Sequence, residues 1–326
     1  SMMKQHTDDL KTFSVKFDYE DYDESHYSNY VADKINSDHK VINFSGKDVK
    51  KLIELLPHHY DEPFADHSMI PTYLVSNVAS EEVTVCLSGD GADELFAGYG
   101  KYKLMKVVNW QNNILKPVFK LFSYLPLPGK IKRYFLYSRY EAYQQYANLN
   151  SYKYIEDISS EDLEVYERYE EYFEDDIIQD MTESDSLNYL PEDILTKLDR
   201  ASLGNGLEAR TPFLDHDMIE LAFSIKSDMK MKWFNTKYIL KKAVKGIIPS
   251  KIIERKKEGF GSPIKYYLKT ELKPLVKKYV IDYDKHSHFD NINKKELYED
   301  HLEGVRDNSR LLFSILMFNL WWEEWM

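Results

Sequence analysis

A group of acidic and small residues follows a short apolar segment and could bind a phosphate or a metal ion. From Ser88 to Glu94 the sequence is Ser-Gly-Asp-Gly-Ala-Asp-Glu, so glycines alternate with carboxylates. Glycines let the backbone approach a phosphate or ribose closely, and clustered carboxylates attract a hard cation such as Mg²⁺. Without a cationic partner these carboxylates would repel one another. The turn therefore predicts a phosphate or metal site, and a solvated acidic loop is the alternative.

The elements around this turn predict an α/β fold. The apolar segment Val83–Leu87 is typical of a buried parallel strand, and ligands bind at the carboxyl ends of such strands. Strands are also expected at 10–17 and 39–44, with helices at 25–35, 45–56 and 70–78. Strands that alternate with helices predict βαβ units and a parallel sheet. We expect a partial α/β nucleotide-binding region over residues 1–100 and a mainly helical remainder over 101–326, integrated with it.

The composition excludes several classes of protein. The chain has 326 residues, 43 basic against 55 acidic side chains, and a net charge of −12, which argues against a general nucleic-acid binder. No apolar run is long enough to cross a membrane, and the polar N-terminus is not a signal peptide. The single cysteine, Cys86, excludes a disulfide framework and favours a reducing compartment. We expect a cytoplasmic protein with neither a nucleic-acid nor a membrane partner.

Two further segments carry charges in unusual surroundings. Charges of both signs interrupt the apolar sequence at 189–200 and 206–215, which predicts buried ion pairs among the four residues Asp199, Arg200, Glu208 and Arg210. Basic residues precede a Gly-Phe-Gly turn at 255–261. Such a segment suits a mobile loop that brings cations onto phosphates, although a Lys-rich turn alone is usually only solvated.

Four motifs, taken in this order, resemble the asparagine synthetase family. They are Ser88–Glu94 with Gly98-Tyr99, then Leu198-Asp199-Arg200-Ala201, then Leu207–Asp215, and finally Arg255–Phe260. The resemblance extends from Lys11 to about Trp322. It implies a parallel sheet of the adenine-nucleotide α-hydrolase (ATP pyrophosphatase) type, with a large helical C-terminal region. The family uses ATP and Mg²⁺ to adenylate a carboxylate, aspartate being the leading candidate here, and ammonia then displaces AMP.

The resemblance also implies roles for individual residues. Val15, Ser88 and Gly89 would contact the adenosine part of ATP, and Asp93 would help to hold Mg²⁺ on the pyrophosphate. Three further residues would act at the reacting groups: Asp90 near the acyl-adenylate, Tyr99 at the reaction centre, and Lys257 on the charge that develops on the phosphates. A divalent ion and a positioned ammonium are what such charge development requires.

The sequence departs from the family pattern in two parts of its machinery. The family's pyrophosphate loop, Ser-Gly-Gly-x-Asp-Ser, is absent from these residues, and Ser45-Gly46-Lys47-Asp48 is in the wrong place and is interpreted as a helix cap. The glutaminase domain that would supply ammonia is absent too. We therefore expect a piece of a longer enzyme that is inactive alone. An exposed sheet edge could pair two copies into a homodimer.

The carboxylate acceptor is a separate question. Asparagine synthetases commonly carry Glu where this chain has Asp90, whereas relatives that amidate other carboxylates carry Asp. A shorter side chain leaves room for a larger substrate. An amidotransferase of the surface-polysaccharide or β-lactam type is therefore an alternative, and so is a remnant that keeps the fold without catalysis.

Overall fold

A parallel pair of strands forms the N-terminal part of the computed structural model, which describes residues 1–126, 132, 135–151, 157–255 and 259–326. Strand β1 (Lys11–Phe17) pairs in parallel with β2 (Asp38–Phe44), and Val15 lies opposite Ile42. Side chains alternate along β1. The Ser14 hydroxyl faces Ser28 on helix α1 (Ser25–Ile35), whereas Val15 packs into the core on the other side. The strands and helix expected here are confirmed.

The second pair of strands comes from distant parts of the chain. Strand β3 (Val85–Leu87) pairs in parallel with β4 (Glu208–Arg210), which sequence patterns did not predict. In the described residues the parallel strands thus form two separate pairs. The prediction of a buried strand was wrong, because Val85 and Leu87 are 41% and 45% exposed. Both side chains lie on a face of this two-stranded sheet that is open to solvent.

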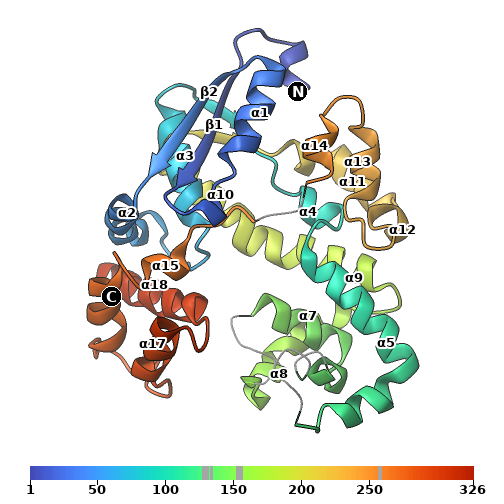
Figure 1. The fold of residues 1–326 in the computed structure, drawn as a ribbon, viewed down its shortest axis with the longest axis vertical. Coiled ribbons are helices and arrows are strands. Elements are labelled where there is room, and N and C mark those ends of the chain that lie inside the picture. The colour runs from blue at the N-terminus through green and yellow to red at the C-terminus, as the bar shows by residue number, and fades with distance from the viewer. Residues whose placement is uncertain (127–131, 133–134, 152–156, 256–258) are drawn as a thin grey trace.

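The largest hydrophobic core joins the first sheet to the C-terminal helices. Helix α2 (Gly46–His59) begins after Ser45, whose backbone N–H donates to the Asp48 carboxylate at 3.1 Å, so the interpretation of this segment as a helix cap is confirmed. Buried side chains of α2 and of α3 (Met69–Ser80) pack against the C-terminal elements, which Figure 1 draws in orange and red. These elements are α15 (Ile264–Tyr267), α16 (Lys273–Val276), a π-helical turn (Lys277–Ile281), α17 (Lys294–Glu303) and α18 (Ser309–Trp325).

A long helix connects the sheet region to a second, helical core. It runs through α9 (Ile177–Ser184), a π-helical segment (Asp185–Leu195) and α10 (Thr196–Leu203), and Figure 1 shows it crossing the centre of the molecule. Pro191 lies within the π-helical segment and has no N–H to donate, which breaks the regular α-helical hydrogen bonding. The second core lies among α5 (Gly100–Phe122), α7 (Ala142–Asn150), α8 (Ser160–Tyr166) and α9.

A third, smaller group of helices completes the fold. It comprises α11 (His216–Ser224), α12 (Ser227–Lys230), α13 (Tyr238–Ala243) and α14 (Ser250–Ile253). Short helix α4 (Ala92–Leu95) contributes Leu95 to its core and lies centrally in Figure 1. Short 3₁₀ segments occur at Met3–Gln5, Glu20–Tyr22, Tyr137–Arg139, Glu167–Tyr172 and Pro212–Leu214. Among the described helices, none is both long and apolar enough to cross a membrane.

Candidate functional site

The segment Ser88–Glu94 leads from β3 into the first residues of α4. The Ser88 N–H donates to the Arg210 carbonyl at 2.8 Å, which fixes the start of the turn against β4. The Ser88 hydroxyl donates to the Asp90 carboxylate. Gly91 has a φ of +89°, and a Cβ there would lie 2.3 Å from Cδ2 of Leu214. Only glycine therefore suits this position, since both the backbone conformation and the neighbouring side chain exclude a larger residue.

The three carboxylates of the turn have three different partners. Asp90 accepts from Ser88, Asp93 forms an ion pair with Lys237 at 2.9 Å, and Glu94 accepts from the Tyr99 hydroxyl. No group of three or more His, Cys, Asp or Glu side chains that could hold a metal ion occurs in the described part of the chain. Asp93 therefore offers one carboxylate rather than a cage. One carboxylate fits Mg²⁺ when substrate phosphates supply further ligands.

Tyr99 and Glu94 form a buried pair at the start of helix α5. Glu94 is only 1% exposed, and burial raises the pKa of its carboxyl group, with Asp93 and Asp185 adding to the rise. Burial and the neighbouring Glu94 also raise the pKa of Tyr99, so its hydroxyl remains a proton donor. Lys101 lies behind this pair, with its ammonium 5.1 Å from the centre of the Tyr99 ring and 2.6 Å from the buried Asp185 carboxylate.

A second charged cluster lies near the turn, and the sequence patterns did not identify it. Lys197 on α10 contacts the Asp66 carboxylate at 2.7 Å and the Asp193 carboxylate at 3.7 Å. Asp90 helps to raise the pKa of Lys197, although less than Asp66 and Asp193 do. The i, i+4 spacing of Asp193 and Lys197 in apolar sequence is a signal for this pair. Nothing in the sequence around Asp66 marks it as the third member.

The two aspartates of this cluster differ in acidity. Both carboxyls lose hydration by burial, which alone raises a pKa. At Asp66, Lys197 and His67 outweigh burial and hold the pKa well below its usual range. At Asp193, burial and the charge of Asp66 raise the pKa to about 7. The pKa values of these neighbouring carboxyl groups are therefore shifted in opposite directions, and strongly shifted pKa values are common at functional sites.

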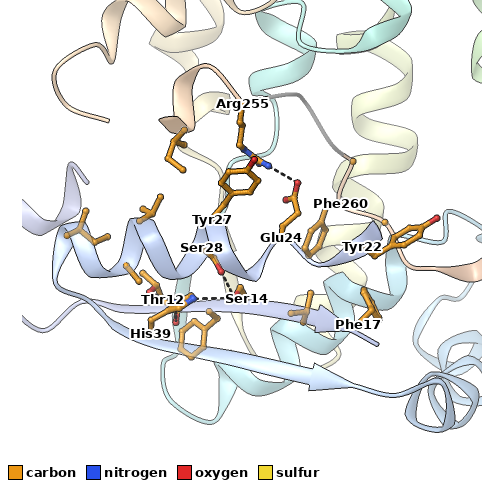
Figure 2. Close-up of a pocket in the computed structure, with 18 residues that line it drawn as sticks. Thr12, Ser14, Phe17, Tyr22, Glu24, Tyr27, Ser28, His39, Arg255 and Phe260 are labelled. Carbon is orange, nitrogen blue, oxygen red and sulfur yellow. Dashed lines mark hydrogen bonds and ion pairs between the residues drawn. The ribbon is translucent and has the colours of Figure 1, made fainter. Parts of the chain in front are cut away.

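Val15 lines a cavity of about 340 Å³ between β1, α1 and the segment after α14. Figure 2 shows hydroxyl and imidazole groups at one end, where the Ser14 and Thr12 hydroxyls contact His39 at 3.2 and 2.9 Å. At the other end Arg255 forms an ion pair with Glu24 at 2.7 Å. Ser88 and Gly89 do not line this cavity. The structure thus does not bring the three predicted adenosine contacts together around this cavity.

The predicted phosphate loop is anchored at its far end. Lys257 lies outside the described residues. The Ser262 N–H donates to Nδ1 of His67 at 3.3 Å, and the Ser262 hydroxyl donates to the His67 carbonyl at 3.1 Å. A Cβ at Gly261 would lie 2.7 Å from Cε1 of His67. This end of the loop therefore packs directly against the residue that follows Asp66.

The prediction of buried ion pairs among Asp199, Arg200, Glu208 and Arg210 was wrong, because these side chains are exposed. Arg210 contacts Glu208 at 2.7 Å, but their side chains are 65% and 55% exposed. Both residues lie on the same face of β4, because they are two positions apart in a strand. Arg200 likewise contacts Asp199 and Asp61 at exposed positions. The pairing is present, but these charges are not buried.

Comparison with known proteins matches these motifs to one family. The family model for asparagine synthase matches residues 1–323. Asparagine synthetase [glutamine-hydrolyzing] 1 of Bacillus subtilis is 30% identical over 335 residues, covering 98% of this chain and 53% of the relative. A putative asparagine synthetase of Mycobacterium bovis is 29% identical over 335 residues, covering 97% of this chain and 51% of the relative.

A third relative is more similar over a shorter stretch. A putative asparagine synthetase of Methanocaldococcus jannaschii is 45% identical over 100 residues, covering 30% of this chain and 19% of the relative. The chain spans about half the length of the first two relatives. Since the family model covers nearly every residue, the chain belongs to the asparagine synthase family.

Proposed function

We propose that this chain carries the ATP-dependent amide-forming part of a glutamine-hydrolysing asparagine synthetase. The proposal is supported chiefly by the turn after β3, where Asp90, Asp93 and Glu94 each have a different partner. Such a turn lies where α/β proteins bind ligands. Together with family membership, it favours an enzyme over a remnant, because a decayed site has no physical need for these contacts.

The proposed reaction has two steps. A side-chain carboxylate oxygen of aspartate attacks the α-phosphorus of ATP, the bond to the β-phosphate oxygen breaks, and pyrophosphate leaves. Ammonia then attacks the acyl carbon, the bond to the AMP oxygen breaks, and a proton is released as the amide forms. A divalent ion would supply charge neutralisation on the phosphates. In the whole protein, the ammonia would come from hydrolysis of glutamine.

The residues divide between binding and chemistry. We propose that Val15, Ser88 and Gly89 contact the adenosine part, and that Asp93 contributes one ligand to Mg²⁺. Asp90 would lie beside the acyl-adenylate, where the carboxylate–Ser88 hydrogen bond fixes its direction. Tyr99 would lie at the reaction centre. Lys257 would meet the charge that develops on the phosphates.

We propose that residues 1–326 alone do not form the acyl-adenylate, because they contain no Ser-Gly-Gly-x-Asp-Ser loop for pyrophosphate. The test compares pyrophosphate release and product mass for this polypeptide and for the gene product that contains it, given ATP, Mg²⁺, aspartate and ammonia. We expect asparagine and pyrophosphate from the gene product only. Pyrophosphate release by residues 1–326 would contradict the claim of inactivity.

A second candidate keeps the chemistry and changes the acceptor. Asp90 is shorter than the Glu that is common in asparagine synthetases, which leaves space for a larger carboxylate. An amidotransferase of another carboxylate would release pyrophosphate with that acid and give no asparagine from aspartate. A non-catalytic remnant would release no pyrophosphate with any carboxylic acid.

A further inference from the structure

Two aromatic residues lie exposed at the tip of a tight turn between α12 and α13. The Lys232 N–H donates to the Asn235 carbonyl at 3.2 Å, and the Asn235 N–H donates to the Lys232 carbonyl at 2.9 Å. Trp233 and Phe234 are the two residues between them, and they are 79% and 54% exposed. Helices α12 and α13 lie at the right-hand side of Figure 1. The turn therefore presents two large apolar side chains to the surroundings of the molecule.

The backbone at this tip is unfavourable for a tryptophan. Trp233 has a φ of +55°, in the left-handed region that favours glycine and that bulky residues rarely adopt. The exposed indole also buries little apolar surface, so it adds little to the stability of the fold. Neither the local conformation nor the packing thus explains a tryptophan at this position. A contact outside the folded chain would explain it.

The segment that carries this turn is strongly basic. Residues 229–253 contain seven lysines and no acidic residue, in a chain whose net charge is −12. Lys232 and Lys242 are exposed, and their ammonium groups lie 5.2 and 5.6 Å from the centre of the Tyr238 ring. One tyrosine ring thus holds two lysines beside the aromatic turn.

The positive charge extends beyond the turn. Burial lowers the pKa of Lys241, and the charges of Lys103 and Lys237 lower it further. Lys103 is an exposed residue of α5, so positive charge continues from α13 onto the start of α5. The nearest acidic residues along the chain are Asp228 and Glu254, at the two ends of the basic segment.

We propose that the Trp233–Phe234 turn docks the protein on a bilayer that contains anionic lipids. The two aromatic rings enter the headgroup region, and Lys232 and Lys242 lie beside lipid phosphates. Tryptophan is enriched at the interface between membrane and water, and lysines near the surface are attracted by anionic lipids.

The shape of the turn favours a lipid surface over a protein partner. A stable protein interface buries about 800 Å² on each partner, which a convex tip of two residues does not provide. Lipid headgroups can move aside around such a tip. The composition of the whole chain predicted no membrane partner, but this segment has the opposite charge from the chain as a whole. The inference makes no use of the proposed function.

Vesicle flotation of the purified gene product tests the role of the lysines. We expect it to bind vesicles of phosphatidylcholine with about 30% phosphatidylglycerol roughly tenfold more tightly than vesicles of phosphatidylcholine alone. Lys232→Gln combined with Lys242→Gln should lose roughly tenfold in affinity for the anionic vesicles. The control combines Lys273→Gln with Lys295→Gln, which removes the same charge from exposed positions elsewhere and should bind like the wild type. Equal affinities of the two double variants would overturn the proposal.

Variants of Trp233 test the aromatic tip. Trp233→Gly should weaken binding roughly tenfold without lowering the midpoint of urea unfolding, because glycine suits the positive φ. Trp233→Phe should still bind, but quenching of tryptophan fluorescence by lipids with brominated acyl chains should be lost. Val305→Ala, at a 71% exposed position after α17, is the control and should change neither measurement. Wild-type affinity of Trp233→Gly, or quenching that survives Trp233→Phe, would overturn the proposal.

Two other uses of the turn have different outcomes. Binding of a single-stranded oligonucleotide that requires Trp233, without binding to vesicles, would overturn the proposal and assign the turn to base stacking. Self-association that Trp233→Gly abolishes, again without binding to vesicles, would overturn it and make the turn a contact between copies. None of these measurements contains ATP, so their outcome is separate from that of the proposed function.

Discussion

The Tyr99 hydroxyl donates a hydrogen bond to the Glu94 carboxylate inside the protein, where Glu94 is 1% exposed. The hydrogen bond opposes the rise in the pKa of Glu94 that burial causes. It connects α4, which carries Asp93, to the start of α5. The geometry of the acidic turn thus depends on a tyrosine five residues downstream.

Replacing Tyr99 with Phe should lower the free energy of unfolding by about 2 kcal/mol, because a buried carboxyl group loses its donor. The pKa of Glu94 is raised in the folded state, so its ionisation opposes folding as pH rises above the unfolded value. The variant raises that pKa further. The loss should therefore be larger at about pH 8 than at about pH 5. Urea unfolding of the wild type and of Tyr99→Phe at both pH values measures this loss of stability.

Tyr124→Phe is the matched control, since Tyr124 is 66% exposed and its substitution should change little. An equal loss of stability at both pH values would show that the Tyr99 hydroxyl does not act through Glu94.

Because of Asp193, the free energy of unfolding should decrease as the pH rises from about 4 to 7. Its pKa is about 7 in the folded protein, above the ordinary value, so the folded state holds a proton that the unfolded state has already lost. Asp193→Asn should flatten this part of the profile. Asp180, whose pKa burial and Asp176 also raise to about 7, contributes the same sign.

The measurement is urea unfolding across this pH range for the wild type, Asp193→Asn, Asp180→Asn and the double variant. The double variant should show the flattest profile. If Asp193→Asn kept the wild-type slope, the carboxylate would already be ionised in the folded state over this range.

Local patterns predicted much of the fold and less of the site. The strand at β1, the helix α1 and the cap at Ser45 depend on neighbouring residues, which is why periodicity and cap signals identified them. Strand β4 has three residues and exists only because it pairs with β3, more than a hundred positions away. No local pattern could specify that pairing.

The site shows the same division. The motif around Ser88 was identified from residue types and spacing. The contacts of Asp93 with Lys237, and of Lys197 with Asp66, join segments that are far apart in sequence. Burial also cannot be predicted from charge alone, which is why Glu208 and Arg210 were expected inside and lie outside.

Arg210→Ala should therefore change the free energy of unfolding by less than about 1 kcal/mol, as is usual for exposed ion pairs. Added salt should reduce the difference in the free energy of unfolding between Arg210→Ala and the wild type, because it screens charges at the surface. Urea unfolding at low and high ionic strength is the measurement. A loss of several kcal/mol would contradict the exposed position of this ion pair.

Replacing each of two glycines of the acidic turn with alanine should change the stability of the protein at one position and not at the other. Gly91→Ala combines a positive φ with a clash against Leu214, so we expect a loss of about 1–3 kcal/mol in the free energy of unfolding. A Cβ at Gly89 has no heavy atom within 4 Å, so Gly89→Ala should fold with nearly wild-type stability.

If Gly89 contacts adenosine, the same change should weaken ATP binding, because a methyl group would occupy the space that the nucleotide needs. Urea unfolding and calorimetric ATP titration of the gene product separate these effects. Gly89→Ala that binds ATP like the wild type would remove Gly89 from the adenosine contacts, whereas a stable Gly91→Ala would show that the turn can rearrange around Leu214.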